Sequence, residues 1–129
     1  MPHVIVEYSA NIEAELPPQR LVEDIHQAAI ASGIAEPVAV RTRLMRREHY
    51  RVGDGNPENA FVHIDIRARK GRTLEQKKAA VQAIYDQANK TLDPVFKARP
   101  LALTVEIHEI DPETRMLRNG MRERKANAA

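Results

Sequence analysis

The sequence contains no cysteine and no tryptophan, and only 4% of its residues are aromatic. The lack of cysteine excludes disulfide bonds and thiolate zinc sites, and it is typical of proteins from a reducing cytoplasm. A nucleic-acid-binding surface usually combines a basic face with aromatic stacking residues, whereas this chain has few aromatics and a net charge of only +2. We therefore expect a cytoplasmic protein that does not bind nucleic acid.

Long apolar runs are absent as well. No stretch approaches the roughly 18 apolar residues that a membrane span requires, and the first residues do not resemble a secretory signal, so no membrane association is expected. The 129 residues, of which 43% are hydrophobic and 29% charged, fit one ordinary globular domain. We predict a single domain that covers residues 1–129.

What the chain does contain is an internal repeat. Residues 4–8 and 62–66 both alternate apolar and polar side chains, which predicts two half-buried strands. A helical apolar stripe follows each strand. The first stripe starts after Pro17-Pro18, comprises Leu21, Ile25, Ala28 and Ala29, and is expected to end at Gly33. The second stripe follows a capping box of Thr73 and Gln76, and it comprises Leu74, Val81, Ile84, Ala88 and Leu92.

A further strand is expected after each helix, opening at a proline, at residues 37–40 and 100–107. The prediction is an α+β fold of two tandem β-α-β units, at about residues 2–45 and 60–110. Right-handed crossovers make the two strands of each unit parallel, and the result is a four-stranded mixed sheet with two helices on one face. Residues 111–129 form a polar tail without clear periodicity, which we interpret as a solvated or subunit-clasping arm.

Pro2 stands at the head of the first strand, directly after the initiator methionine. A small second residue normally permits removal of Met1, and the new terminus is then a secondary amine. A free α-amino group has a pKa of roughly 8, and burial or nearby positive charge lowers it. A neutral prolyl nitrogen is therefore a candidate general base, and its conjugate a candidate acid.

Three arginines occupy positions suited to carboxylate binding. Arg41 and Arg43 are two residues apart on a predicted strand and so share a face, where paired guanidinium groups can grip carboxylates. Arg72 lies between a strand and a helix N-terminus, which already favours anions. The other basic residues of that segment are expected on the surface: Arg67, Arg69 and Lys70.

Four short segments carry a family resemblance: Met-Pro-His-Val-Ile-Val-Glu at residues 1–7, Val-Arg-Thr-Arg at 40–43, Ala-Phe-Val-His at 60–63 and Gly-Arg-Thr-Leu-Glu at 71–75. Together they resemble the 5-carboxymethyl-2-hydroxymuconate isomerases of the tautomerase superfamily. Residues 63–109 also resemble the single-unit 4-oxalocrotonate tautomerases. The resemblance extends over the chain to about Ile110.

This resemblance implies a homotrimer and a cofactor-independent keto-enol tautomerase that acts on a small carboxylate from aromatic catabolism. Pro2 is then the catalytic residue, and Arg41 and Arg72 bind substrate carboxylates. The resemblance does not assign Arg43, which from its place beside Arg41 either binds substrate or pairs with an acid across the sheet.

Three alternatives remain open at this point. Residues 61–72 also resemble relatives that dehalogenate haloacrylates by adding water, for which Glu7 and Glu106 are candidate acids by residue type only. A non-catalytic oligomeric binding protein would keep the fold while Met1 blocked Pro2. A metal site is not expected, because none of the five histidines has the helical spacing of a zinc enzyme.

Overall fold

The two repeats build one continuous sheet, and a computed structural model describes this arrangement for residues 2–128. The first repeat contributes β1 (His3–Ser9) and β2 (Arg41–Arg47), and the second contributes β3 (Ala60–Arg69) and β4 (Leu101–Ile110). Strand order is β2-β1-β3-β4, with parallel pairing inside each repeat and antiparallel pairing between β1 and β3. The predicted mixed sheet of two tandem β-α-β units is therefore confirmed.

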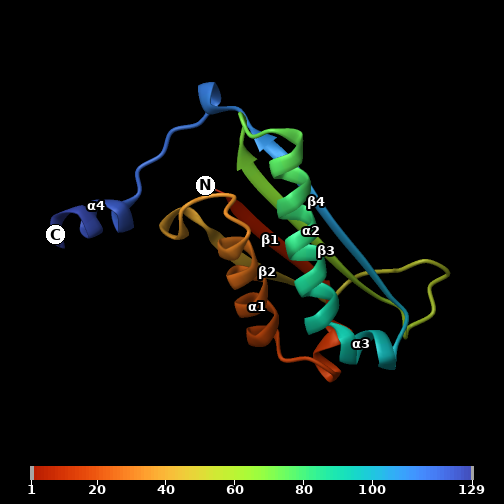
Figure 1. The fold of residues 1–129 in the computed structure, drawn as a ribbon. Coiled ribbons are helices and arrows are strands. Elements are labelled where there is room, and N and C mark those ends of the chain that lie inside the picture. Colours follow the sequence, from red (N-terminus) through yellow and green to blue (C-terminus); the bar gives the residue numbers. More distant parts are fainter. Residues whose placement is uncertain (1, 129) are drawn as a thin grey trace.

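Two long helices cover one face of the sheet (Figure 1), as the apolar stripes predict. Helix α1 (Pro18–Ala31) begins after Pro17, where the missing N–H of Pro18 costs nothing, and Gly33 follows it with a positive φ of 72°. Helix α2 (Leu74–Thr91) begins with the expected capping box, since the Thr73 side chain accepts from the Gln76 amide and the Gln76 side chain accepts from the Thr73 amide.

The core lies between these helices and the sheet. Alternate residues of the central strands β1 and β3 meet the buried stripes of α1 and α2, and they are the side chains expected from the period-2 pattern. The main members are Val4, Val6, Val62, Ile64, Ile66, Leu21, Ile25, Ile84, Ala88 and Leu92. Leu74 is the exception to the predicted stripe, because it sits in the first turn of α2 and is 63% exposed.

One predicted strand boundary is wrong. Residues 37–40 do not open β2; Pro37–Ala39 forms a 3-10 turn (η2), and the strand starts at Arg41. The amides of Ala39 and Val40 donate to the carbonyls of Glu36 and Pro37 within this turn, so they are not available to a neighbouring strand. A period-2 pattern alone does not distinguish such a turn from a strand.

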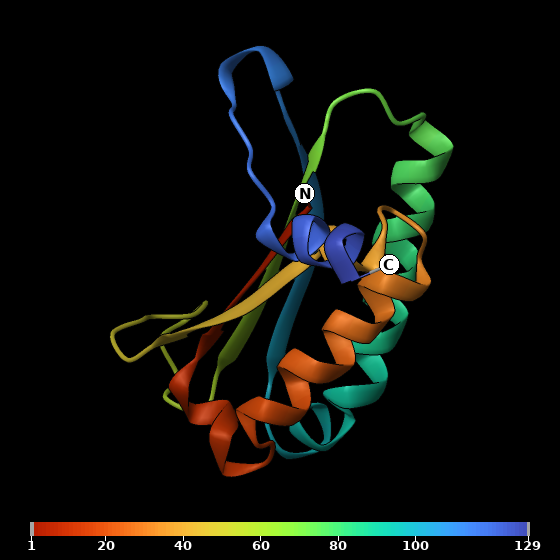
Figure 2. The same cartoon turned by 90° about the vertical axis from the view of Figure 1, so that its left-hand side faces the viewer.

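Short helices complete the fold. Two 3-10 turns, η1 (Ala10–Ala14) and η3 (Pro112–Thr114), follow β1 and β4, and α3 (Asp93–Ala98) extends the end of α2. The tail, for which no helix was expected, contains α4 (Gly120–Ala128). Figure 2 shows the chain leaving β4, turning back and returning as an arm towards the end of the sheet where the chain begins.

The other sheet face is not covered by α1 or α2 (Figure 2). It carries several polar and charged side chains. These include His3 and Glu7 from β1 and His63, Asp65 and Arg67 from β3, all partly or fully exposed. Across residues 2–128 we find no helix long and apolar enough to cross a membrane.

Candidate active site

Pro2 lies at the entrance to β1, and its side chain is buried, with less than 2% exposed. Its carbonyl oxygen accepts a hydrogen bond of 3.1 Å from the Arg41 amide nitrogen at the start of β2. The next residue, His3, pairs with Arg41 on one side and with Arg67 on the other. Pro2, which carries the candidate base, is therefore held in place by the main-chain bond to Arg41 and by the burial of its ring.

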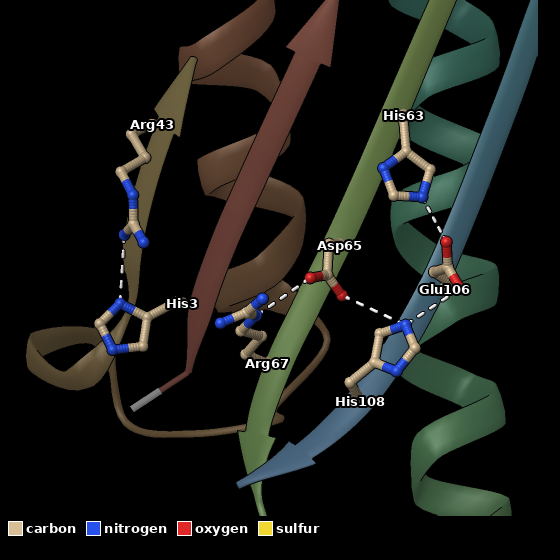
Figure 3. Close-up of polar contacts among 7 residues, drawn as sticks. All are labelled: His3, Arg43, His63, Asp65, Arg67, Glu106 and His108. Atoms are coloured by element: carbon tan, nitrogen blue, oxygen red, sulfur yellow. Dashed lines mark hydrogen bonds and ion pairs between the residues drawn. The ribbon is translucent and has the colours of Figure 1, made fainter. Parts of the chain in front are cut away.

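The register of β1 and β2 puts Arg41 opposite His3 and Arg43 opposite Ile5. Both arginines therefore lie on the uncovered sheet face, as their spacing predicts. Arg43 Nη1 donates to His3 Nδ1 at 3.1 Å (Figure 3). Burial, followed by the positive charges of Arg43 and Arg41, lowers the pKa of His3, which matches an imidazole nitrogen that accepts a hydrogen bond.

Arg41 reaches towards the residues just before its own strand. Its Nη1 lies 3.5 Å from the Ala39 carbonyl oxygen. Ala39, in turn, is part of the wall of a cavity of about 450 Å³. The Arg41 guanidinium therefore contacts one residue of the cavity wall, whereas Arg43 is directed to His3.

Arg72 also belongs to this cavity. It follows Gly71, whose φ of 123° turns the chain between β3 and α2. Arg72 Nε donates to the Ile34 carbonyl at 2.7 Å and Nη1 donates to the Arg69 carbonyl at 2.9 Å. These two bonds fix the plane of the guanidinium, and since a guanidinium carries five N–H groups, donors remain for a ligand.

The wall of this cavity, which we call the arginine cavity, brings together segments that are far apart in the chain. Arg69 ends β3 and is exposed, as expected, and it also lines the cavity. Its complete lining is Ala39, Arg69, Arg72, Pro112, Arg115, Leu117 and Arg122. Sequence reasoning missed Arg69, Arg115 and Arg122; the only signal for the last two was the crowding of basic residues in the tail.

The arm that supplies Arg115 and Arg122 is fastened by Asn119, which is only 7% exposed. Asn119 Nδ2 donates to the Val38 carbonyl at 3.0 Å, and its Oδ1 accepts from the amides of Met121 and Arg122 at the start of α4. The Arg122 guanidinium pairs with Glu36. One buried side chain thus caps α4 and docks the arm beside β2.

A second polar cluster crosses the open face between β3 and β4 (Figure 3). Glu106 bonds to both His63 and His108, His108 lies 3.6 Å from Asp65, and Asp65 pairs with Arg67 at 3.1 Å. The hydrogen bonds from His63 and His108 lower the pKa of Glu106. Within residues 2–128, no group of three or more His, Cys, Asp or Glu side chains is arranged to hold a metal ion.

The two acids considered for water activation are both engaged. Glu7 pairs with Arg47 at 3.0 Å, and Glu106 is held by its two histidines. A cavity of about 520 Å³ lies between α2 and β4, lined in part by Val81, Ile107 and His108. No predicted site residue lines it, whereas Arg72 lines the arginine cavity.

A sequence profile described as 5-carboxymethyl-2-hydroxymuconate isomerase matches residues 2–125. The chain belongs to the 5-carboxymethyl-2-hydroxymuconate isomerase family. The match begins at Pro2 and extends through most of the arm. Membership makes the chain an isomerase of the tautomerase superfamily.

Individual relatives agree with this assignment. The Escherichia coli 5-carboxymethyl-2-hydroxymuconate Delta-isomerase is 29% identical over 121 residues, which cover 94% of this chain and 96% of the relative. A crystal structure of a 5-carboxymethyl-2-hydroxymuconate delta-isomerase superposes with a TM-score of 0.84 at 20% identity, covering 92% and 87% of the two chains. A symmetric trimer of a fused 4-OT has the same fold, with a TM-score of 0.64 at 20% identity over 91% and 92%.

Proposed function

We propose that this isomerase ketonises a 2-hydroxymuconate-type dienol acid, with 5-carboxymethyl-2-hydroxymuconate as the expected substrate, by proton transfer at the nitrogen of Pro2. Removal of Met1 creates the reactive secondary amine. The observation that carries the proposal is the placement of Pro2, which is buried, tied to Arg41 through its carbonyl, and adjacent to the strand that bears Arg41 and Arg43. The family name and the E. coli relative supply the substrate class.

The reaction moves one proton and leaves the composition of the substrate unchanged. The neutral Pro2 nitrogen takes the proton from the enol hydroxyl, the electron pair of the broken O–H bond forms the carbonyl, and the conjugated system shifts. The prolinium then delivers the proton to a remote carbon, which yields an unsaturated 2-oxo acid and restores the base. No redox partner or cofactor is required for this balance.

The arginines hold the anionic substrate during this transfer. Arg41 and Arg72 bind carboxylates and stabilise the negative charge that develops on the enolate oxygen, because guanidinium groups match carboxylates with paired hydrogen bonds. Arg43 supports the site through His3, since its guanidinium is already directed to that ring at 3.1 Å. Arg72 is pre-oriented by its two carbonyl partners and needs little reordering.

We further propose that the chain acts as a single tautomerase-like domain in a homotrimer in the cytoplasm. The trimeric fused 4-OT with the same fold supports the oligomer, and the sheet face that α1 and α2 leave uncovered offers a surface for contact between copies. The lack of cysteine supports the proposed cytoplasmic location, because reducing compartments do not favour disulfide bonds.

The test combines intact mass with kinetics. The natively expressed protein is expected to lack Met1 and to ketonise the dienol, and Pro2→Ala is expected to reduce kcat/KM by about 100-fold, which is the lower range for loss of a general acid–base group. Pro57→Ala, in the exposed loop before β3, is the matched control and is expected to leave the rate unchanged.

A second variant blocks the nitrogen directly. Insertion of leucine between Met1 and Pro2 prevents methionine removal and converts the Pro2 nitrogen to a tertiary amide, and we expect no turnover. Full activity in this variant, verified by mass, would show that the general base lies elsewhere.

A further inference from the structure

The arginine cavity holds an excess of positive charge that nothing in its wall balances. Four arginines line it, namely Arg69, Arg72, Arg115 and Arg122, and its lining includes no Asp or Glu. Arg122 is paired with Glu36 outside the lining, whereas residues 2–128 offer no ion-pair partner to Arg69 or Arg115. Cavities lined by one sign of charge concentrate ions of the other sign.

Among these four arginines, Arg115 is distinguished by a buried nitrogen atom that lacks a partner in the described residues. Its Nε is buried and has no hydrogen-bond partner within the described part of the chain. Buried N–H groups are nearly always satisfied, and since the residue Arg115 also lines the cavity, a ligand there that accepts a hydrogen bond can pair with this donor once the guanidinium turns towards it. A carboxylate fits this demand, because it offers two acceptor oxygens to the fork of an arginine.

The position of Arg115 is set by the arm rather than by the sheet. The residue follows η3 and precedes Asn119, whose buried amide docks the arm on the Val38 carbonyl. Arg69 lies two residues beyond Arg67, the partner of His3, at the end of β3 that adjoins the start of β1. The arm therefore supplies Arg115, Leu117 and Arg122 to the wall of the arginine cavity.

We propose that Arg115, with Arg69, binds an additional carboxylate of the substrate away from the reacting atoms, so that the C-terminal arm selects tricarboxylate over dicarboxylate dienols. This inference rests on the proposed function for the chemistry that follows binding. Arg41 and Arg72 serve the carboxylates nearest the transferred proton, and Arg115 serves the remaining one. Arg122 acts on the arm, through Glu36, and not on the substrate.

Binding tests the site without requiring turnover. Calorimetric titration of the processed full chain with tricarballylate, glutarate and inorganic phosphate compares a tricarboxylate, a dicarboxylate and a simple anion. Arg115→Ala is expected to weaken tricarballylate by about 10-fold or more, as loss of a charge-assisted hydrogen bond implies, and glutarate by less than about 2-fold. Arg115→Lys is expected to recover part of the loss, since it keeps the charge but not the fork.

Arg118→Ala is the matched control. Arg118 lies on the same arm, its side chain is 84% exposed and pairs with Glu123, and it does not line the cavity. We expect it to leave all three affinities unchanged. An equal loss for the three anions in Arg115→Ala would reveal only a change in net charge and would overturn the proposal.

Kinetics then separate this proposal from the proposed function. For Arg115→Ala we expect KM for 5-carboxymethyl-2-hydroxymuconate to rise about 10-fold with kcat nearly unchanged, and KM for 2-hydroxymuconate to stay constant. If the wild-type chain turns over both dienols and Arg115→Ala alters neither KM nor tricarballylate affinity, the arm proposal is wrong and the function stands. If neither dienol reacts, the function is wrong, and the calorimetry still decides the binding site.

Discussion

The Arg41 amide nitrogen donates to the Pro2 carbonyl oxygen at 3.1 Å, and the Arg41 guanidinium lies 3.5 Å from the Ala39 carbonyl at the edge of the arginine cavity. One residue therefore bonds to Pro2 through its main chain and contacts Ala39, a residue of the cavity wall, through its side chain. Because these roles use different atoms, a side-chain substitution separates them.

Arg41→Ala is expected to lower kcat/KM by about 10- to 100-fold, mainly through KM, since a charge-assisted hydrogen bond contributes about 1.5–3 kcal/mol. The main-chain bond to Pro2 is retained, so the thermal midpoint should stay within a few degrees of wild type. Steady-state kinetics and a melting curve provide the measurement. Arg20→Ala on the surface of α1 is the control, and an unaltered KM in Arg41→Ala would remove this residue from the site.

The contact between Arg43 and His3 predicts a coupled titration. Burial lowers the pKa of His3 first, and the Arg43 charge lowers it next, so Arg43→Ala should raise the His3 pKa towards, but not fully to, its ordinary value near 6.5. The protonated fraction of His3 at pH 6 therefore increases in the variant. NMR titration of the His3 ring protons measures this shift. Arg118→Ala should leave the curve in place, and a downward shift in Arg43→Ala would contradict the assignment.

The two glycines at positions 71 and 120 form a matched pair. A methyl group added to either one would meet no neighbouring atom within 4 Å, but Gly71 has a φ of 123° and Gly120 does not have a positive φ. Gly71→Ala is expected to cost about 1–3 kcal/mol in unfolding free energy through backbone strain and to impair dienol binding by displacing Arg72. Gly120→Ala, at the start of α4, should be neutral or slightly stabilising. Equal effects in urea denaturation would show that φ is not the cause.

Replacement of Asn119 is expected to destabilise the C-terminal arm locally and to leave the rest of the fold unaffected. Asn119→Ala removes the cap of α4 and the bond to Val38, which typically costs about 1 kcal/mol. Hydrogen exchange should accelerate in residues 115–128 while the sheet and α1 keep their protection. Asn89→Ala serves as a control, because that side chain donates only to the Tyr85 carbonyl of its own helix. Faster exchange throughout the chain would indicate a wider structural role.

Local patterns were sufficient for most of the fold. The alternation in residues 4–8 and 62–66 predicted β1 and β3, and Thr73 with Gln76 predicted the first turn of α2. These features depend on neighbours within a few positions, so the sequence carries them directly. The 3-10 turn at Pro37–Ala39 and the short helix α3 were missed, because brief apolar segments beside prolines are compatible with several backbone conformations.

By itself the sequence determined the two β-α-β repeats, the parallel pairing within them, the place of Pro2 at the head of a strand and the common face of Arg41 and Arg43. Only the tertiary structure decided that Arg72 is fastened to the Ile34 and Arg69 carbonyls and that Arg115 meets Arg69 and Arg72 around one cavity. Periodicity reports which side of an element is buried, whereas it carries no information on which distant segment lies opposite. The arm is weakly patterned, and its place depends on one buried side chain, Asn119, and its partner Val38.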